Sequence, residues 1–354
     1  MVVGGGVTGC SCALTLARSG LRVRLLEARE IAAGASGRNG GFALRGLCPP
    51  YDEARESLGA DGAQALWKLT ERALDLMSEL AGDALRRVGS LRLAVDDVEL
   101  DALRREYEAL GGDGFAADWL DPLPHPLPRL FAGGFHHPGD GALSPALWTR
   151  RLAGHAAAAG AEILEHSPVD REAIDGLEAA ELVLAVDGMT DSLAPELAPL
   201  VVPMRGQVLA TEPLPLVYER PHYARGGYDY WQQLPDGRLI LGGRRDTSLE
   251  SEQTTADETT PYIQDQLERF AAELTGRTPA ITHRWSGFWG QTVDLLPLAG
   301  RLPGTDRIWV AGGYSGHGNV LGFACGELVA RAILGEPAPE LEWFDPARSP
   351  ATAE

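Results

Sequence analysis

The chain has 354 residues, of which 44% are hydrophobic and 23% are charged, and these globular proportions exclude disorder for most of its length. Acidic residues outnumber basic ones by 50 to 31, so the formal charge is −19, which disfavours nucleic acid and anionic membrane surfaces as partners. The length predicts about two domains.

Three features that the sequence lacks restrict the possible functions and cellular locations further. Lys68 is the only lysine and lies in a stretch that predicts a helix surface, so Schiff-base chemistry is disfavoured. The four cysteines have no zinc-ligand spacing, which indicates free thiols and no metal site. There is no apolar run of about 18 residues and no basic-then-apolar N-terminus, so we expect a cytoplasmic protein without a transmembrane segment.

The first 26 residues predict a strand, a glycine turn, a helix and a second strand. Gly4, Gly6 and Gly9 have the spacing that allows a tight turn, a close backbone approach to a pyrophosphate and close packing of helix on strand. The N-terminus of the helix then offers free N–H groups to phosphates. Glu27 follows 18 residues after Gly9, where a carboxylate can accept hydrogen bonds from ribose hydroxyls. The motif predicts dinucleotide binding, and the alternative is a glycine-rich loop with an incidental surface glutamate.

The remaining segments alternate between the two kinds of secondary structure. They predict a glycine-rich loop over 34–46, helices over 52–85, 98–110, 144–160 and 261–275, strands over 90–95, 182–186, 228–234, 238–241 and 307–311, a stiff proline loop over 121–128, and a C-terminal glycine loop and helix over 312–334. The predicted fold is α/β, with a Rossmann-like FAD-binding domain and an interleaved antiparallel-sheet α+β substrate domain. We expect residues 1–80, 141–200 and 286–340 in the FAD-binding domain, 81–140 and 201–285 in the substrate domain, and 341–354 as a C-terminal tail.

Two further glycine-rich segments favour FAD over NAD. They are residues 34–41 and residues 308–318, and the second precedes a helix. A strand–glycine–helix unit at the far end of the chain suits a long cofactor that is contacted at both ends, and the helix N-terminus could stabilise negative charge on a reduced flavin. The alternative for each segment is a turn followed by a helix cap.

These motifs together resemble the FAD-dependent amine and amino-acid oxidoreductases of the D-amino-acid oxidase superfamily, and the resemblance spans nearly the whole chain. The GASGRNGG form is most similar to the branch of gamma-glutamylputrescine oxidases and related bacterial amine oxidases. The motifs that carry it are GGGVTG, LLEARE, GASGRNGGF, GALSPALWTRRL, PMRGQVLATEPL, LPDGRLILGG, TVDLLPLAG and GGYSGHGNVLGFACGELVARAILG.

The resemblance implies cofactor-binding roles for matching positions. Those near the pyrophosphate and adenosine are Gly4, Gly6, Val7, Gly9, Glu27, Ala28, Ala35, Ser36 and Val169. Those near the flavin ring are Arg38, Asn39, Gly40, Gly41, Phe42, Gly313, Tyr314, Ser315, Gly316, His317, Gly318 and Asn319.

Departures from the family pattern bear on substrate and acceptor. Trp289 stands where many members have an arginine that binds the substrate carboxylate, which favours an amine or an amino acid held differently. The alternative is that Trp289 belongs to the core and that Arg225, Arg244 or Arg245 binds the carboxylate.

The absence of a flavin-side lysine leaves oxidase and dehydrogenase activity open. No cysteine matches the site of covalent flavin attachment, so FAD is expected to be non-covalent. The segment between Val169 and the strand at 182 is short, and the family's hairpin there is expected to be trimmed.

Aromatic residues of the β-rich segment are candidate substrate-binding residues. Tyr228 and Tyr230 are predicted on one face of a strand, with Trp231 on the other. Together with Trp289 and His317 they form the candidate substrate site; the alternatives are sheet-surface aromatics for the tyrosines and a loop-capping role for His317.

The resulting hypothesis is FAD-dependent oxidation of a C–N bond in a small amine or amino acid. Hydride passes to the flavin, the imine hydrolyses, and dioxygen or another acceptor takes the electrons. No catalytic base is assigned. The alternatives are a monooxygenase or reductase linked to NAD(P)H, and a degenerate, non-catalytic flavin-binding protein.

Overall fold

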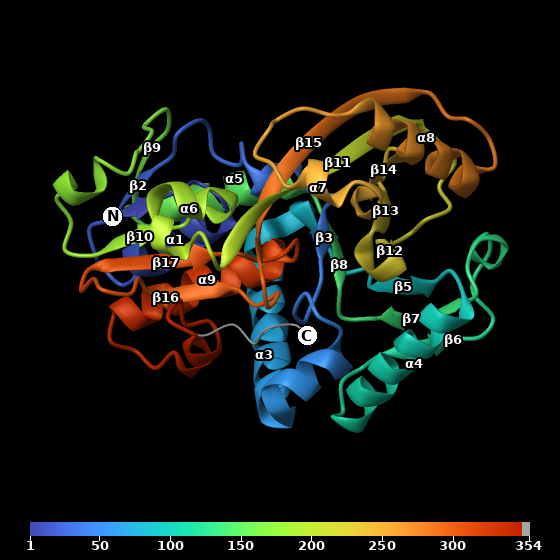
Figure 1. Cartoon of the computed structure of the whole chain (residues 1–354), viewed down its shortest axis with the longest axis horizontal. Coiled ribbons are helices and arrows are strands. Elements are labelled where there is room, and N and C mark those ends of the chain that lie inside the picture. Colours follow the sequence, from blue (N-terminus) through green and yellow to red (C-terminus); the bar gives the residue numbers. More distant parts are fainter. Residues whose placement is uncertain (349–354) are drawn as a thin grey trace.

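A computed structural model describes residues 1–348 and contains three β-sheets (Figure 1). The first sheet has six strands in the order β16-β17-β10-β1-β2-β9. All neighbours are parallel except β16 and β17. The strands are β1 (Val2–Val3), β2 (Arg24–Leu26), β9 (Glu162–Leu164), β10 (Leu182–Leu184), β16 (Leu298–Arg301) and β17 (Ile308–Gly312). Strands from both ends of the chain, β1 and β17, therefore lie parallel to β10 on either side of it.

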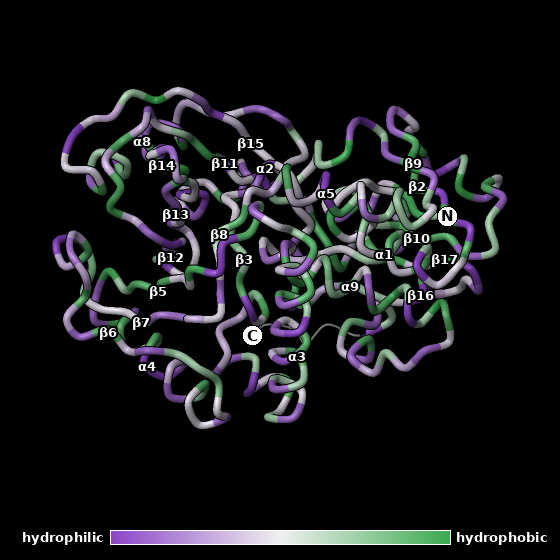
Figure 2. The backbone as a smooth tube through the Cα atoms, turned by 180° about the vertical axis from the view of Figure 1, so that it is seen from behind, coloured by the Kyte–Doolittle hydropathy of each residue, from purple (hydrophilic) through white to green (hydrophobic). Residues whose placement is uncertain are grey.

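Two helices from opposite ends of the chain pack closely beside this sheet. These are α1 (Val7–Arg18) and α9 (Gly318–Ile333), and both are largely buried and mostly white to green in Figure 2. A Cβ added at Gly326 of α9 would lie 2.3 Å from the carbonyl oxygen of Thr8, and the hydroxyl of Ser11 donates to the carbonyl of Phe323 at 2.7 Å. The helices approach this closely because α9 has no side chain at the contact. Helices α3 (Tyr51–Ala81) and α5 (Pro145–Ala158) pack in the same core.

The second sheet has eight strands in the order β15-β11-β14-β13-β12-β5-β7-β6 and is antiparallel except between β12 and β5. Its core includes Trp231 and, from α8 (Pro261–Thr275), Leu267 and Phe270. The strands are β5 (Ser90–Ala94), β6 (Asp118–Leu120), β7 (Gly133–His137), β11 (Val201–Pro213), β12 (His222–Ala224), β13 (Asp229–Gln233), β14 (Arg238–Gly243) and β15 (Ile281–Thr292). The further helices are α2 (Ala35–Arg38), α4 (Asp97–Gly112), α6 (Thr190–Leu193) and α7 (Leu249–Glu252).

A small third sheet lies between the two large ones in Figure 1. It has the order β3-β8-β4, from β3 (Phe42–Ala43), β8 (Gly141–Leu143) and β4 (Leu85–Arg86). The side-chain amide of Gln232 on β13 donates to the carbonyl of Gly40 at 2.6 Å, which fixes the segment before β3 against the eight-stranded sheet. The glycine-rich segment before β3 is therefore attached directly to the eight-stranded sheet.

Several local predictions needed correction. Tyr228 lies before β13, in the cap of a short 3-10 turn, so the alternation that placed it on a strand face with Tyr230 does not apply. The predicted loop 34–46 contains α2 and β3, and the long β15 was not predicted. Between Val169 and β10 the chain forms one 3-10 turn, Ile174–Gly176, and no strand.

The mixed α/β fold class with a Rossmann-like sheet and an antiparallel sheet is confirmed. The proposed division into an FAD-binding and a substrate domain stays a prediction. The strand β15 crosses its proposed boundary at residue 285. Of the proposed tail, residues 349–354 lie outside the described residues. Over residues 1–348 no helix combines the length and the apolar character needed to cross a membrane.

The close contact between α1 and α9 predicts that replacing its glycine by alanine lowers the stability of the protein, although alanine usually stabilises a helix. Gly326→Ala is expected to destabilise the protein by about 1–3 kcal/mol, because the new methyl group overlaps the Thr8 carbonyl. Gly154→Ala, in α5 with open space around it, is the matched control and is expected to stabilise by about 0.4–1 kcal/mol. Urea unfolding of both variants measures the difference, and equal stabilisation by both would contradict the packing described here.

Candidate functional site

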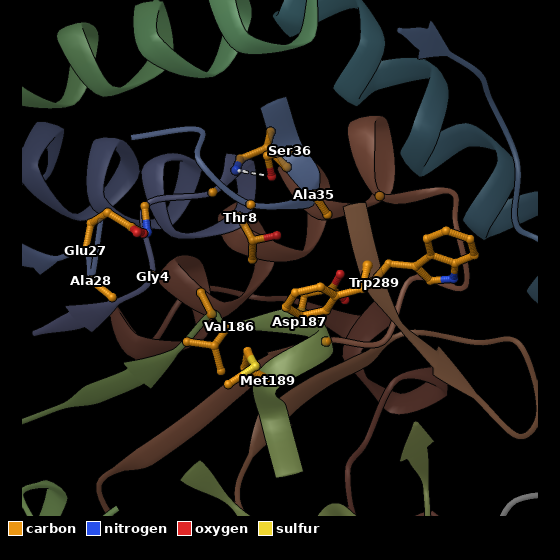
Figure 3. A pocket seen from close by; sticks show the side chains of 18 of the residues that line it. Gly4, Thr8, Glu27, Ala28, Ala35, Ser36, Val186, Asp187, Met189 and Trp289 are labelled. Carbon is orange, nitrogen blue, oxygen red and sulfur yellow. Dashed lines mark hydrogen bonds between the residues drawn. The ribbon is translucent and has the colours of Figure 1, made fainter. Parts of the chain in front are cut away.

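A cavity of about 520 Å³ opens where β1, β2 and β10 end and α1 begins. Figure 3 shows it running from Glu27 and Ala28 at one end to Trp289 at the other, with Thr8 and Asp187 between them. The helix α1 begins at Val7, and its N-cap Gly6 has no side chain, so the first turn of the helix faces the cavity. Such a helix end attracts anions such as phosphate.

Close backbone contacts require glycine at one position in the turn before α1 and at one position in the first turn of the helix. Gly4 has φ +110°, and a Cβ there would lie 2.2 Å from the carbonyl oxygen of Ala185 on the neighbouring chain segment. A Cβ at Gly9 would lie 2.0 Å from the carbonyl oxygen of Gly4. The two glycines therefore allow a tight turn packed closely against Ala185 and against the first turn of α1, and the turn lines the cavity through Gly4, Gly5 and Gly6.

Glu27 shapes the turn and also lines the cavity. Its carboxylate accepts a hydrogen bond from the backbone N–H of Gly5 at 2.7 Å through one oxygen and from that of Arg29 at 2.8 Å through the other. An ionised carboxylate has about four acceptor positions, so two remain for a ligand. Glu27 therefore has the acceptor capacity that ribose hydroxyls need.

The other end of the cavity joins the glycine-rich segment at 34–42 to the start of α9. The side-chain amides of Asn39 and Asn319 donate to each other at 3.1 and 3.0 Å. Asn39 also accepts from the backbone N–H of Gly41 at 2.8 Å, and Asn319 donates to the carbonyl of Phe42 at 2.7 Å. These bonds hold the two segments together at the wall of the cavity.

A second, smaller cavity of about 120 Å³ adjoins the first. The two share the lining residues Ala35, Asn39, Trp289, Gly316 and Asn319. The remaining lining of the small cavity is Arg38, Gly40, Phe42, Leu44, Gly206, Val208, Tyr223, Gly227, Tyr230, Arg245, Gly287, Ser315, His317 and Val320. A long ligand in the large cavity would therefore have one end beside a pocket large enough for a small molecule.

Tyr230 and His317 in the wall of the small cavity are held neutral by their surroundings. Burial raises the pKa of Tyr230 to about 12. Burial, and then the charge of Arg92, lowers the pKa of His317 to about 4, and both ring nitrogens of His317 are buried without a hydrogen-bond partner in the described chain. At neutral pH the imidazole is therefore uncharged, and its unprotonated nitrogen can accept a hydrogen bond.

Most of the residues expected at the cofactor line one of these cavities. The large cavity is lined by Gly4, Gly6, Val7, Glu27, Ala28, Ala35, Ser36, Asn39, Val169, Tyr314, Gly316, Gly318 and Asn319. The small cavity is lined by Arg38, Gly40, Phe42, Ser315 and His317, and also by the candidate substrate residues Tyr230 and Trp289. Gly9, Gly41, Gly313 and Tyr228 line neither.

Sequence reasoning missed Asp187 and the loop that contains Asp257, both of which line the large cavity. Asp257 pairs with Arg38 and, at 3.6 Å, with Arg29, so this loop is tied across the cavity wall. No sequence pattern described above indicated a role for Asp187 or for Asp257.

Asp187 is a buried acid in the wall of the large cavity. It has φ +46°, and its Oδ1 accepts the backbone N–H of Gly313 at 2.9 Å. Burial raises the pKa of Asp187 to about 6, although backbone N–H groups, including those of Gly290 and Gly313, oppose the rise. The side chain is therefore largely neutral in weak acid and charged above neutrality.

Comparison with known proteins identifies relatives over nearly the whole chain. The family described as FAD dependent oxidoreductase matches residues 1–332. The chain is 31% identical over 387 residues to the probable oxidoreductase OrdL of Rhizobium meliloti (strain 1021), covering 99% of this chain and 86% of that one. It is 28% identical to the gamma-glutamylputrescine oxidoreductase of Escherichia coli (strain K12), covering 95% and 83%.

Solved structures share the fold described above. Glycine oxidase from Geobacillus kaustophilus superposes with a TM-score of 0.80 at 25% identity and covers 98% of both chains. L-proline dehydrogenase from P. horikoshii superposes with a TM-score of 0.81 at 22% identity, covering 98% of this chain and 96% of that one, and this similarity concerns the fold alone.

Ionisation of Asp187 predicts a pH-dependent effect of Asp187→Asn on stability. Because the folded-state pKa is raised to about 6, the contribution of Asp187 to the free energy of unfolding is fully present below about pH 4 and is lost as the pH rises through 6. The asparagine variant does not ionise, so its stability relative to the wild type should increase by roughly 2 kcal/mol between pH 4.5 and 7.5.

Urea unfolding at both pH values measures this difference. Asp306→Asn, at an exposed position between β16 and β17, is the control and should show no such change. A stability difference for Asp187→Asn that stays constant with pH would show that Asp187 is not held neutral by the fold.

Proposed function

The chain belongs to the family of FAD-dependent oxidoreductases, and we propose that it oxidises a C–N bond of an amine or amino acid with non-covalently bound FAD. The observation that carries the proposal is the pair of adjoining cavities, which share Asn39, Trp289 and Asn319 in their walls. One cavity is long and opens on a helix N-terminus, and the other is small and lined by aromatic side chains. Relatives named for an amine and for an amino acid support this reaction class.

The residues of the large cavity fit FAD. The open glycine turn at Gly4 and the N-terminus of α1 suit the pyrophosphate, and Glu27 suits the adenosine ribose. The start of α9 at the other end would hold the flavin ring, where its helix dipole favours negative charge. Bound FAD supplies an acceptor for the hydride that leaves the substrate carbon.

The residues of the small cavity would orient the substrate and keep water away from it. Tyr230 and Trp289 form apolar walls, and the hydroxyl of Tyr230 is held protonated and can donate a hydrogen bond. Loss of hydride from carbon requires a neutral amine, so the ammonium proton must leave first. Because its pKa is lowered to about 4, His317 is too weak a base to take this proton, so the amine loses the proton to solvent. The neutral imidazole can then accept a hydrogen bond from the amine N–H. Hydride and proton loss convert the amine to an imine, and water then hydrolyses the imine to a carbonyl compound and an amine or ammonia.

The electrons leave to dioxygen or to another acceptor. Lys68 is the only lysine of the chain and is exposed on α3, away from both cavity linings. Any reaction with dioxygen would therefore proceed without a lysine ammonium at the cofactor, and both an oxidase and a dehydrogenase fit the site.

Anaerobic addition of substrate should bleach the flavin absorbance of the purified protein. The measurement is a stopped-flow screen of small amines and amino acids, each amino acid being paired with the amine that lacks its carboxylate. Bleaching by at least one compound, without NAD(P)H, is the expected result. Reduction by NADPH alone would favour a monooxygenase or reductase, and a folded protein that binds no FAD would refute the proposal.

Loss of the Glu27 carboxylate should weaken FAD binding. Glu27→Ala is expected to raise the dissociation constant by about 10- to 100-fold, because charge-assisted hydrogen bonds to the ribose and the support of the turn are both lost. The dissociation constant is measured by titrating FAD with the apoprotein and recording the FAD fluorescence. Glu30→Ala, an exposed neighbour outside the cavity lining, is the control, and equal affinities for both variants would exclude a role of Glu27.

A further inference from the structure

We propose that the substrate carries a carboxylate in addition to its amine, and that Arg245 is the residue that binds this carboxylate. The inference rests on the proposed function, because it concerns the small cavity in which the amine would be oxidised. It names the chemical class of the substrate, an amino carboxylate, and distinguishes it from amines and diamines without an acid group.

Arg245 lies over two aromatic rings at the edge of the small cavity. It follows β14, and its guanidinium carbon lies 4.4 Å from the ring centroid of Tyr228 and 5.1 Å from that of Trp289. Stacking of this kind orients a guanidinium by its faces and leaves the N–H groups on its edges free to donate. A planar fork held in this way matches the two oxygens of a carboxylate.

Neighbouring arginines already have acidic partners, but Arg245 has none. Arg244 lies 2.9 Å from Asp229, and Arg225 pairs with both Asp229 and Asp246. Within residues 1–348, no carboxylate oxygen lies within 4.0 Å of the Arg245 guanidinium, and its buried Nε has no hydrogen-bond partner. A buried donor without a partner is costly, and a carboxylate ligand would relieve that cost.

The charge of the small cavity selects the same ligand. Its lining contains no aspartate or glutamate within the described part of the chain, and the only other cation in it, Arg38, is paired with Asp257. Burial keeps Tyr223 and Tyr230 protonated and His317 neutral. The pocket therefore has one uncompensated positive charge, which attracts a carboxylate and repels a second ammonium group.

Trp289 explains why the carboxylate-binding arginine lies in the turn after β14, at Arg245, and not on β15. The family resemblance predicts a carboxylate-binding arginine at position 289, where this chain has an indole that cannot make that bond. The indole instead stacks on Arg245 and lines the boundary between the two cavities. The carboxylate would bind at Arg245, and the carbon to be oxidised would then face the shared boundary at Asn39 and Gly316.

Binding of a carboxylate that cannot be oxidised tests the inference on the FAD-loaded protein. Benzoate and its neutral counterpart benzamide are titrated while the flavin absorbance is recorded. We expect benzoate to bind more tightly than benzamide to the wild type, and Arg245→Met to raise the benzoate dissociation constant by about 10- to 100-fold. Arg245→Lys keeps the positive charge but loses the planar pair of N–H donors. Its benzoate dissociation constant should lie between those of the wild type and Arg245→Met.

Arg238→Met is the matched control, because Arg238 lies on β14, pairs with Asp236 at 3.0 Å and lies outside both cavity linings. Its affinity for benzoate should equal that of the wild type. Equal benzoate affinity of the wild type and Arg245→Met would overturn the assignment, as would tighter binding of benzamide than of benzoate to the wild type.

The paired amine screen separates this inference from the proposed function. If amino acids bleach the flavin of the wild type, and this bleaching is lost or slowed at least 10-fold in Arg245→Met, the result supports both the Arg245 assignment and the proposed function. Bleaching by simple amines as fast as by their matched amino acids overturns the Arg245 assignment and leaves the reaction class intact. Benzoate binding that depends on Arg245, with no bleaching by any amine or amino acid, supports the carboxylate site and overturns the proposed reaction.

Discussion

The close packing of α9 on α1 is the contact on which the site depends. Gly326 lies against the Thr8 carbonyl, and Ser11 donates to the carbonyl of Phe323, so the two helices approach without intervening side chains. The contact brings the glycine turn at the start of the chain and the one near its end into a single cavity wall. Any change that separated the helices would therefore separate the two ends of the proposed cofactor site.

The rest of the site follows from segments that cross between the two large sheets. The bonds between Asn39 and Asn319 join the first glycine-rich segment to α9, and Gln232 joins the same segment to the eight-stranded sheet. The long strand β15 then brings Trp289 to the boundary of the two cavities. The small cavity is enclosed by elements that are distant in sequence, and its positive charge arises because only one of its arginines lacks an acidic partner.

Local spacing was enough to predict the turn at Gly4–Gly9, the acid at Glu27 and the alternation of helices and strands around them. These features depend on backbone conformation within about 30 residues, which sequence patterns record well. The strand β15 escaped prediction because its sequence, ITHRWSGFWGQT, mixes polar residues with two glycines, and its pairing with β11 defines it. The position of Tyr228 before β13 likewise depends on the turn at Arg225–Gly227.

The roles of Asp187, Asp257 and Arg245 depend on tertiary contacts that no local pattern encodes. Burial, and not sequence context, raises the pKa of Asp187, and Asp257 reaches Arg38 from a loop far along the chain. The sequence left Arg225, Arg244 and Arg245 as equal candidates for a carboxylate partner. Only the positions of Asp229 and Asp246 distinguish them, because these acids neutralise the first two arginines.

A crystal structure of the FAD-loaded protein with bound benzoate tests the central claim most directly. We expect FAD to extend through the large cavity from Glu27 to Asn319, and the benzoate carboxylate to lie within hydrogen-bond distance of the Arg245 guanidinium in the small cavity. FAD bound outside the large cavity, or benzoate bound away from Arg245 while that guanidinium stays without a partner, would contradict it.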